Sequence, residues 1–243
     1  MTRFDAVRGL HGHGHSIAET DLLPGGHWRL LETFELLALL RLPRALGPAV
    51  QPETRRPQGL EYLRPLLRAA QAGQVVDFAY QKFWEDAPER RTAGPLLLKE
   101  FRGRWYVLAV MVDSGRLACF GLDRISDFSV TAQRFAPPVG FDARTYFADC
   151  FGITRPTDGQ LPEEILLRFE PVQGRYALSY PLHSSQQVVL ENEAEIRLRL
   201  TVYDTYELRM ELLSYGPDVE VLAPIGLRDW LRRQHTAAAG PRR

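Results

Sequence analysis

Hydrophobic residues at helical spacing mark two stretches in the first third of the chain. In Trp28–Leu42 they recur every three to four positions, which predicts an amphipathic helix that ends before Pro43. The stretch Gly59–Ala72 has the same spacing, and Gly73 follows it at the position of a C-terminal cap. Pro65 is expected to make the first turn of this second helix irregular.

Alternating apolar and polar residues replace the helical spacing from Gln74 onward. Short alternating stretches, separated by turn signals such as Arg102-Gly103, predict five strands that form a small antiparallel barrel. Closure of this barrel is expected to hide the edges of its strands. The expected strands are 74–80, 94–101, 104–112, 116–122 and 127–133.

A second pattern of strands and helices begins near residue 164. Pro171 suits the first turn of a helix, and Asp204 with Glu207 has the spacing of a capping box for a helix that ends at Gly216. A final helix is expected over residues 225–234. The order strand-helix-strand-strand-helix-strand predicts a ferredoxin-like βαββαβ domain. Its expected strands are 164–169, 186–190, 195–202 and 218–222.

These patterns predict an α+β protein with N-terminal helices, an antiparallel barrel and a ferredoxin-like domain. The expected divisions are an irregular segment, helix and linker at 1–58, a lead-in helix with the barrel at 59–135, a linker at 136–162, the ferredoxin-like domain at 163–236 and a frayed tail at 237–243.

Composition and charge narrow the possible functions. The chain has 30 basic and 30 acidic residues, so it lacks the overall basic excess typical of a dedicated DNA-binding domain. It has no apolar run of the about 18 residues that a membrane span needs, and no export signal, so we expect a cytoplasmic protein without a membrane partner. Its two cysteines, Cys119 and Cys150, are expected to be free thiols.

Two groups of residues raise the question of metal or catalytic chemistry. His11, His13 and His15 alternate and could share a strand face as zinc or nickel ligands, but glycines between them make the segment flexible and nothing at a ligand spacing completes the set. His183 and Ser184 lack the strained turn and oxyanion hole that a serine nucleophile needs. We therefore expect no cofactor and no enzymatic activity.

Aromatic and basic residues of the predicted barrel suggest a binding site. On a strand, Trp105 and Tyr106 point to opposite faces, and we expect Trp105 to fill the barrel. Arg91, Arg104 and Arg124 lie near strand ends, where guanidinium groups beside aromatic rings suit a nucleotide or single-stranded nucleic acid. The spacing alone fits equally well with core aromatics beside solvated arginines.

Three ordered motifs resemble the WYL-domain family of bacterial transcription regulators: Arg91–Pro95, Gly103–Ala109 and Phe120–Ile125. Later motifs are similar to the WCX extension that follows WYL domains. These are Tyr180–Gln186, Tyr206–Leu208, Leu213–Leu222 and Leu227-Arg228.

This resemblance implies an SH3- or Sm-like barrel that senses a nucleotide or single-stranded nucleic acid, in a homodimeric regulator. The leading hypothesis is that a ligand binds the barrel near Tyr80, Lys82, Arg91, Arg104, Tyr106 and Arg124. The alternative is a structural or protein-interaction module without a small ligand, in which these arginines are solvated charges.

The chain departs from the family pattern at several points. Ala118 and Gly121 stand where the third motif usually has arginines, so the sensing surface is expected to be less basic than in relatives. The family usually has an N-terminal winged helix-turn-helix of about 60 residues, which does not fit before Trp28. Binding of promoter DNA is therefore expected only if a missing N-terminal domain exists.

Overall fold

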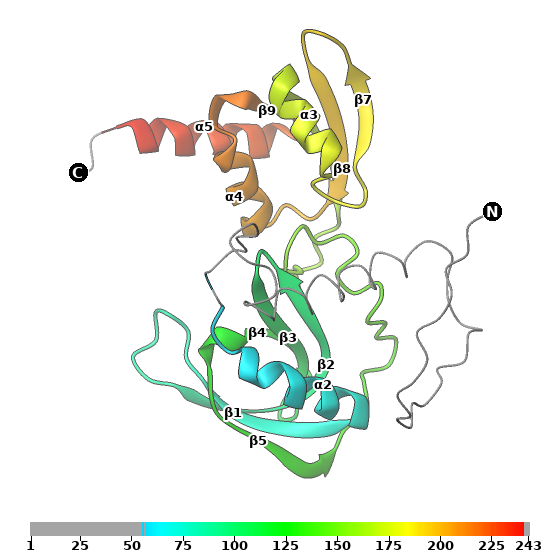
Figure 1. Ribbon diagram of the computed structural model, residues 1–243, viewed down its shortest axis with the longest axis vertical. Helices are drawn as coiled ribbons and strands as arrows, with labels where there is room; N and C mark the ends of the chain where they lie inside the picture. The colour runs from blue at the N-terminus through cyan, green and yellow to red at the C-terminus, as the bar shows by residue number, and fades with distance from the viewer. Residues whose placement is uncertain (1–54, 56, 241–243) are drawn as a thin grey trace, which may run out of the picture. The chain divides into compact units, whose positions relative to one another are not determined.

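The computed structural model describes residue 55 and residues 57–240. Residues 57–240 belong to the unit that begins at Pro57. The expected helix at 28–42, the histidines at 11, 13 and 15, and most of the predicted N-terminal linker lie outside the described residues. The described part is mixed α and β, with two antiparallel sheets and four α-helices (Figure 1).

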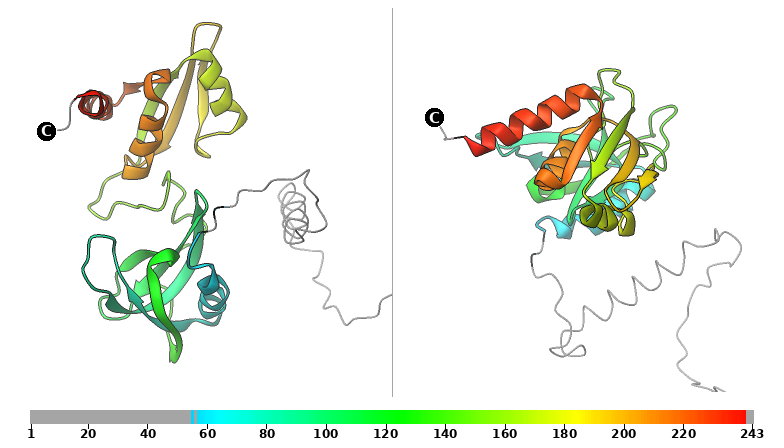
Figure 2. Two further views of the ribbon diagram at one scale, coloured as in Figure 1. Left: turned by 60° about the vertical axis from the view of Figure 1, so that its left-hand side comes forward. Right: turned by 90° about the horizontal axis from the view of Figure 1, so that it is seen from above.

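The first sheet is a curved antiparallel sheet preceded by a helix. A 3-10 turn, η2, and helix α2 replace the single predicted helix, and Gly73 caps α2 with a left-handed φ of 63°, as predicted. Helix α2 lies against β1 and β2 (Figure 2). The elements are η2 Leu60–Tyr62, α2 Leu63–Ala72, β1 Gln74–Tyr80, β2 Glu89–Phe101, β3 Arg104–Met111, β4 Leu117–Gly121, η3 Leu122–Arg124 and β5 Ile125–Arg134.

The predicted closed barrel is wrong. The strands are joined in the order β4-β3-β2-β1-β5, and within residues 57–240 no pairing joins β4 to β5. The sheet therefore has two edge strands, β4 and β5, whereas the predicted closed barrel would have none. A closed barrel would require β4 to pair with β5, and these two strands lie at opposite ends of the sheet. The alternation of residues within each strand does not indicate whether the two strands pair with each other.

The hollow of this sheet holds its core. Phe78, Val107 and Leu122 are fully buried there, and Leu66 of α2 covers them. Trp105 packs against this cluster, as predicted from its position on β3. Because side chains alternate along a strand, the neighbouring positions of β3 point to the other face of the sheet.

That other face is covered by the linker between the two sheets. Leu108 of β3 packs there with Phe147 and Cys150 of the linker and with Tyr203. Within the linker, residues 143–149 form a series of turns, and Tyr146 N donates a hydrogen bond of 3.0 Å to Asp142 O. The linker is thus a packed part of the fold between residues 136 and 162.

The second sheet has the strand order β7-β8-β6-β9 and follows the predicted order of strands and helices. Pro171 occupies the first turn of α3, as predicted, and the Glu170 carboxylate accepts hydrogen bonds from Val172 N and Gln173 N. The elements are β6 Glu163–Phe169, α3 Pro171–Ser179, β7 Gln187–Glu191, β8 Ile196–Val202, α4 Tyr206–Ser214, η4 Gly216–Asp218, β9 Val219–Ala223 and α5 Ile225–Ala239.

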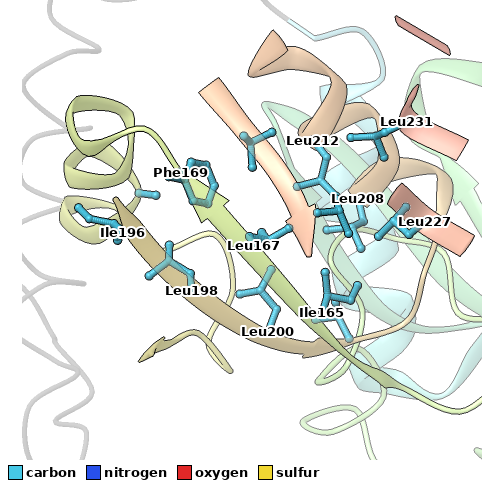
Figure 3. Close-up of a cluster of buried hydrophobic side chains, with 14 residues drawn as sticks. Ile165, Leu167, Phe169, Ile196, Leu198, Leu200, Leu208, Leu212, Leu227 and Leu231 are labelled. Carbon is cyan, nitrogen blue, oxygen red and sulfur yellow. The ribbon is translucent and has the colours of Figure 1, made fainter. Parts of the chain in front are cut away.

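One face of the second sheet carries the core (Figure 3). Leu167 and Leu198 from the sheet pack with Leu208 of α4 and Leu227 of α5, and each is at most 1% exposed. The alternate positions carry charged side chains in ion pairs, such as Arg168 with Glu220. This alternation of apolar and charged residues is the pattern expected for a sheet with one covered face.

Two sequence predictions in this region need correction. The capping box is wrong: the N-cap of α4 is Thr205, without a side-chain capping bond, because Asp204 instead binds Arg209 with N–O distances of 2.7 and 2.9 Å. The Glu207 carboxylate accepts a hydrogen bond from Thr154 Oγ1 at 2.6 Å. Helix α5 continues past its predicted end to Ala239 and takes in part of the predicted frayed tail.

Candidate functional site

The candidate site is centred on Arg124, which follows β4 in the short helix η3. Its guanidinium carbon lies 5.2 Å from the centre of the Tyr80 ring and 5.3 Å from that of Phe83. Tyr80 ends β1 and is almost fully buried, and its hydroxyl accepts a hydrogen bond of 3.3 Å from Gly121 N. Burial raises the pKa of Tyr80, and the nearby Arg124 charge partly opposes this. Tyr80 is thus a fixed support for the Arg124 side chain.

The absence of a side chain at Gly121 leaves room for the side chain of Arg124. A Cβ at this position would lie 2.6 Å from Arg124 Nη2 and 2.5 Å from Asp123 Oδ1. The φ of Gly121 is −70°, so its importance comes from this lack of space and not from its backbone conformation. The family pattern usually has arginine at position 121. In this chain residue 121 is glycine, and the side chain of Arg124 fills the space beside it.

Asp123 joins one further predicted residue to this centre. Its carboxylate pairs with Arg104 at 3.2 Å and with Arg124 at 3.6 Å. Tyr106 lies opposite Gly121 in the β3–β4 register, and burial raises its pKa. Asp123 therefore links Arg104 to Arg124 and, through Arg124, to Tyr80.

The other two predicted residues lie in the β1–β2 loop, which holds Lys82, and at the start of β2, which holds Arg91. Lys82 pairs with Glu85 at 2.6 Å, and Arg91 pairs with Glu89. Both cations lower the pKa of Glu85, and Lys82 has the larger effect through a hydrogen bond. A backbone hydrogen bond of 3.3 Å from Gln81 N to Arg124 O ties the loop to η3.

Two aromatic residues of this loop were missed in the sequence analysis. The exposed fractions of Phe83 and Trp84 are 75% and 76%, far above those of ordinary core aromatics. Each has a cation near its ring: Arg124 at Phe83, and Lys82 at 5.8 Å from the centre of the Trp84 ring. The sequence signal that could have identified them is the adjacent pair of large aromatics directly before the turn at Pro88.

Carboxylates neutralise most of the positive charge at the site. Each predicted cation has an acidic partner, and two of them share Asp123, so four positive charges face three negative charges and one positive charge remains. In two of these pairs, Arg91 with Glu89 and Arg104 with Asp123, one side chain is 59% exposed, and ion pairs at the surface contribute at most about 1 kcal/mol each. A multiply charged anion can therefore displace the carboxylates at a modest cost in free energy.

The residues considered for a hydrolase have structural partners. The His183 Nδ1 atom lies 2.8 Å from Ser185 Oγ, and Ser185 Oγ accepts a hydrogen bond of 2.9 Å from Thr201 N. These contacts fix the loop before β7 onto β8 and do not align His183 with Ser184 as a base and nucleophile.

Two family models match the described part of the chain. The family model described as WYL domain matches residues 61–130, and the model described as WCX domain matches residues 161–239. A comparison with curated proteins finds no match.

Among solved structures, Proteasome accessory factor B/C (PafBC) of Arthrobacter aurescens is 24% identical, with a TM-score of 0.35 over 79% of this chain and 29% of that chain. The structure titled "Crystal structure of a CRISPR Cas-related protein" is 11% identical, with a TM-score of 0.40 over 88% of this chain and 53% of that chain. This chain therefore spans only part of the length of both proteins.

Proposed function

Because the chain belongs to the WYL-domain family and has a WCX domain after its WYL domain, we propose that it is the ligand-sensing and dimerising part of a transcription regulator. Its effector is a nucleotide or a single-stranded nucleic acid. The observation that carries this proposal is the exposed pair Phe83 and Trp84, each beside a cation of the predicted site.

Exposed aromatic rings beside cations suit the chemistry of nucleotides. A base stacked on an aromatic side chain contributes about 1–3 kcal/mol, and this contribution depends little on which base is bound. Phosphate groups bind guanidinium groups through paired, charge-assisted hydrogen bonds. In the proposed complex, bases stack on Phe83 and Trp84, while phosphates replace the carboxylate partners of Arg104 and Arg124.

The proposal includes a fold assignment for each domain. We assign residues 59–135 to an SH3- or Sm-like fold and residues 163–236 to a ferredoxin-like fold. The curved five-stranded sheet supports the first assignment, and the β7-β8-β6-β9 order with α3 and α4 on its covered face supports the second.

The proposed regulator is a non-enzymatic, cytoplasmic homodimer, and the WCX domain transmits the effect of the ligand through the dimer interface. A ligand can do this only if its affinity differs between two arrangements of the dimer. Contact with promoter DNA would require a separate DNA-binding domain. The oligomeric state is measurable by sedimentation equilibrium with and without oligonucleotide.

Fluorescence anisotropy with a labelled 12-nucleotide single strand tests the ligand, with ATP as a competitor. We expect saturable binding at 50 mM salt that weakens by up to roughly fiftyfold at 200 mM, as three or four phosphate contacts predict. Arg124→Ala, and the double variant Phe83→Ser with Trp84→Ser, should each weaken it by at least about tenfold while leaving measurable residual binding. A folded protein that does not bind the strand or ATP at low salt would overturn this part of the proposal.

Matched controls separate the site from general effects of charge and aromatic content. Arg232→Ala removes an exposed cation of α5 that is paired with Asp229 at 3.6 Å, and Tyr180→Ser removes a ring that is 85% exposed near the end of α3. Neither should change oligonucleotide binding. Equal losses in the control and site variants would indicate nonspecific attraction.

The second candidate function is a protein-interaction module without a small ligand. The observation that favours it is the pairing of all four cations with carboxylates of the same domain. This candidate predicts unchanged stability and unchanged dimerisation when Lys82, Arg91, Arg104 and Arg124 are all replaced by glutamine, together with no oligonucleotide binding by the parent protein.

A further inference from the structure

A second cavity lies between the β3–β4 turn and the linker. Its volume is about 780 Å³, which is within the range of small-molecule sites. Its lining residues come from β3, β4, the turn between them and residues 138–157, and they include no member of the candidate nucleotide site. Its occupant must therefore be inferred from its own chemistry.

The walls of this cavity are largely apolar. Leu117 and Ala118 of the edge strand β4 form one side, and Phe141 and Tyr146 of the linker form another. All four are only partly buried although they pack against buried clusters of the domain. The short side chain of Ala118 lines this space, at a position where the family pattern has arginine.

Two arginines supply positive charge to the cavity. Arg116 lines it and makes no ion pair among residues 57–240. Arg155 donates to Tyr146 O at 2.7 Å, and its guanidinium carbon lies 4.9 Å from the centre of the Tyr146 ring. These contacts place a second cation at the apolar wall.

The acidic residue of the lining does not cancel this charge. Asp142 pairs with Arg144 at 3.3 Å and accepts a backbone hydrogen bond from Arg144 N at 2.9 Å. These contacts lower the pKa of Asp142, chiefly through the backbone hydrogen bond. With Asp142 satisfied by Arg144, the charges of Arg116 and Arg155 remain available to a ligand.

We propose that this cavity binds a small organic anion, with an aromatic or aliphatic body between β4 and the linker and one acidic group at Arg116 and Arg155. The Tyr146 ring is partly buried against the linker cluster, unlike the exposed rings of Phe83 and Trp84, so the cavity does not offer the exposed ring that stacking of a base requires. The ligand class therefore differs from that of the nucleotide site.

The test compares two dyes that differ in one charged group. 8-Anilinonaphthalene-1-sulfonate has an aromatic body and a sulfonate, and N-phenyl-1-naphthylamine has the same body without the charge. The full chain should bind the sulfonate at one saturable site. Arg116→Gln combined with Arg155→Gln should weaken this binding by at least about tenfold, since charge-assisted hydrogen bonds contribute about 1.5–3 kcal/mol each. Binding of the neutral dye should change less than about twofold.

Three controls keep this result separate from the proposed nucleotide site and from unfolding. Arg90→Gln removes a cation of β2 outside the cavity, and Arg124→Ala removes the centre of the nucleotide site. Neither should change binding of the sulfonate, and a 12-nucleotide strand should not compete with it. Circular dichroism and thermal unfolding must match between variants, because partly unfolded proteins also bind this dye.

Several results would overturn the proposal. One is binding of the sulfonate that is equally strong in the double arginine variant, and another is binding at many equivalent sites. A third is a double arginine variant that sediments differently from the parent protein but binds the dye equally well. That result would indicate that the cavity is an interface between copies of the chain. Failure of oligonucleotide binding alone would leave this site intact.

Discussion

Arg124 lies where it does because residue 121 is a glycine: its Nη2 is 2.6 Å from the position that a Cβ of Gly121 would occupy. We predict that Gly121→Ala displaces the Arg124 side chain from Tyr80 and weakens oligonucleotide binding. The free energy of unfolding should fall by less than about 1 kcal/mol, because the clashing atoms belong to side-chain ends that can move. Anisotropy and urea unfolding measure the two effects.

A double-variant cycle tests whether Gly121 acts through Arg124. In an Arg124→Ala background, Gly121→Ala should have no further effect on binding, because the side chain that it displaces is already absent. An additional, fully additive loss would show that residue 121 affects the ligand by another route.

The two cysteines predict a loss of stability in alkaline solution. Both are free, and burial raises the pKa of Cys119 to about 12 and that of Cys150 to about 11, from an ordinary value of 9.0. The unfolded chain releases these protons at lower pH than the folded chain, so stability should decline as pH rises above 9. Urea unfolding at pH 8 and pH 10 measures this decline.

The corresponding variant is Cys119→Ala with Cys150→Ala. Its stability should depend less on pH between 8 and 10, and the folded parent protein should react slowly with a thiol reagent at pH 8. Rapid modification of both thiols in the folded protein would contradict the assigned direction of the pKa shifts.

Arg209 is predicted to stabilise the second sheet and its helices. It binds both oxygens of Asp204 and lies 4.9 Å from the centre of the Trp230 ring, so it connects the start of α4 to α5. Arg209→Met should reduce the free energy of unfolding by about 1–3 kcal/mol, since it leaves a largely buried carboxylate without its partner. Arg209→Lys should restore little of this loss, because one ammonium group does not reproduce the two parallel bonds.

The matched control for Arg209 is Arg232→Met. Arg232 and Asp229 form an exposed pair on α5, and removal of such pairs usually has little effect on stability. A loss in the control as large as that in Arg209→Met would indicate a general effect of removing arginines.

His183 predicts a separate loss of stability in acid. Burial lowers its pKa from 6.5, and its Nδ1 accepts a hydrogen bond from Ser185 N, which requires the unprotonated nitrogen. A lowered folded pKa means that the stabilisation is present above pH 6.5 and is lost as pH falls. His183→Gln should therefore narrow the difference in urea stability between pH 7.5 and pH 5.5, and an unchanged difference would contradict this role.

Elements that depend only on neighbouring residues in the sequence were predicted correctly. The two-residue period of Val76, Phe78 and Tyr80 predicted β1, because alternate residues of a strand share one face. The start of β2 was placed too late, at Gly94, because the charged residues from Glu89 onward pair with β1 through backbone groups and need no apolar side chain.

Features that depend on distant partners were not predicted. The spacing of Asp204 and Glu207 fits a capping box, but Arg209 competes for Asp204 and Thr154 for Glu207. The exposure of Trp84 was missed for a similar reason: a sequence gives the residue type but not which neighbours leave it uncovered. The ligand-binding roles of the six predicted residues remain predictions.

The internal pairing of the candidate site has a consequence for selectivity. Every cation of the site is already paired with a carboxylate. A ligand with a single negative charge therefore replaces one ion pair with another and gains little binding free energy. A strand with several phosphates replaces several carboxylates in one binding event, and only the first replacement carries the full entropic cost of association. The proposed site is therefore expected to discriminate by valence: it should ignore chloride and other abundant monovalent anions and respond to polymers that carry several phosphates.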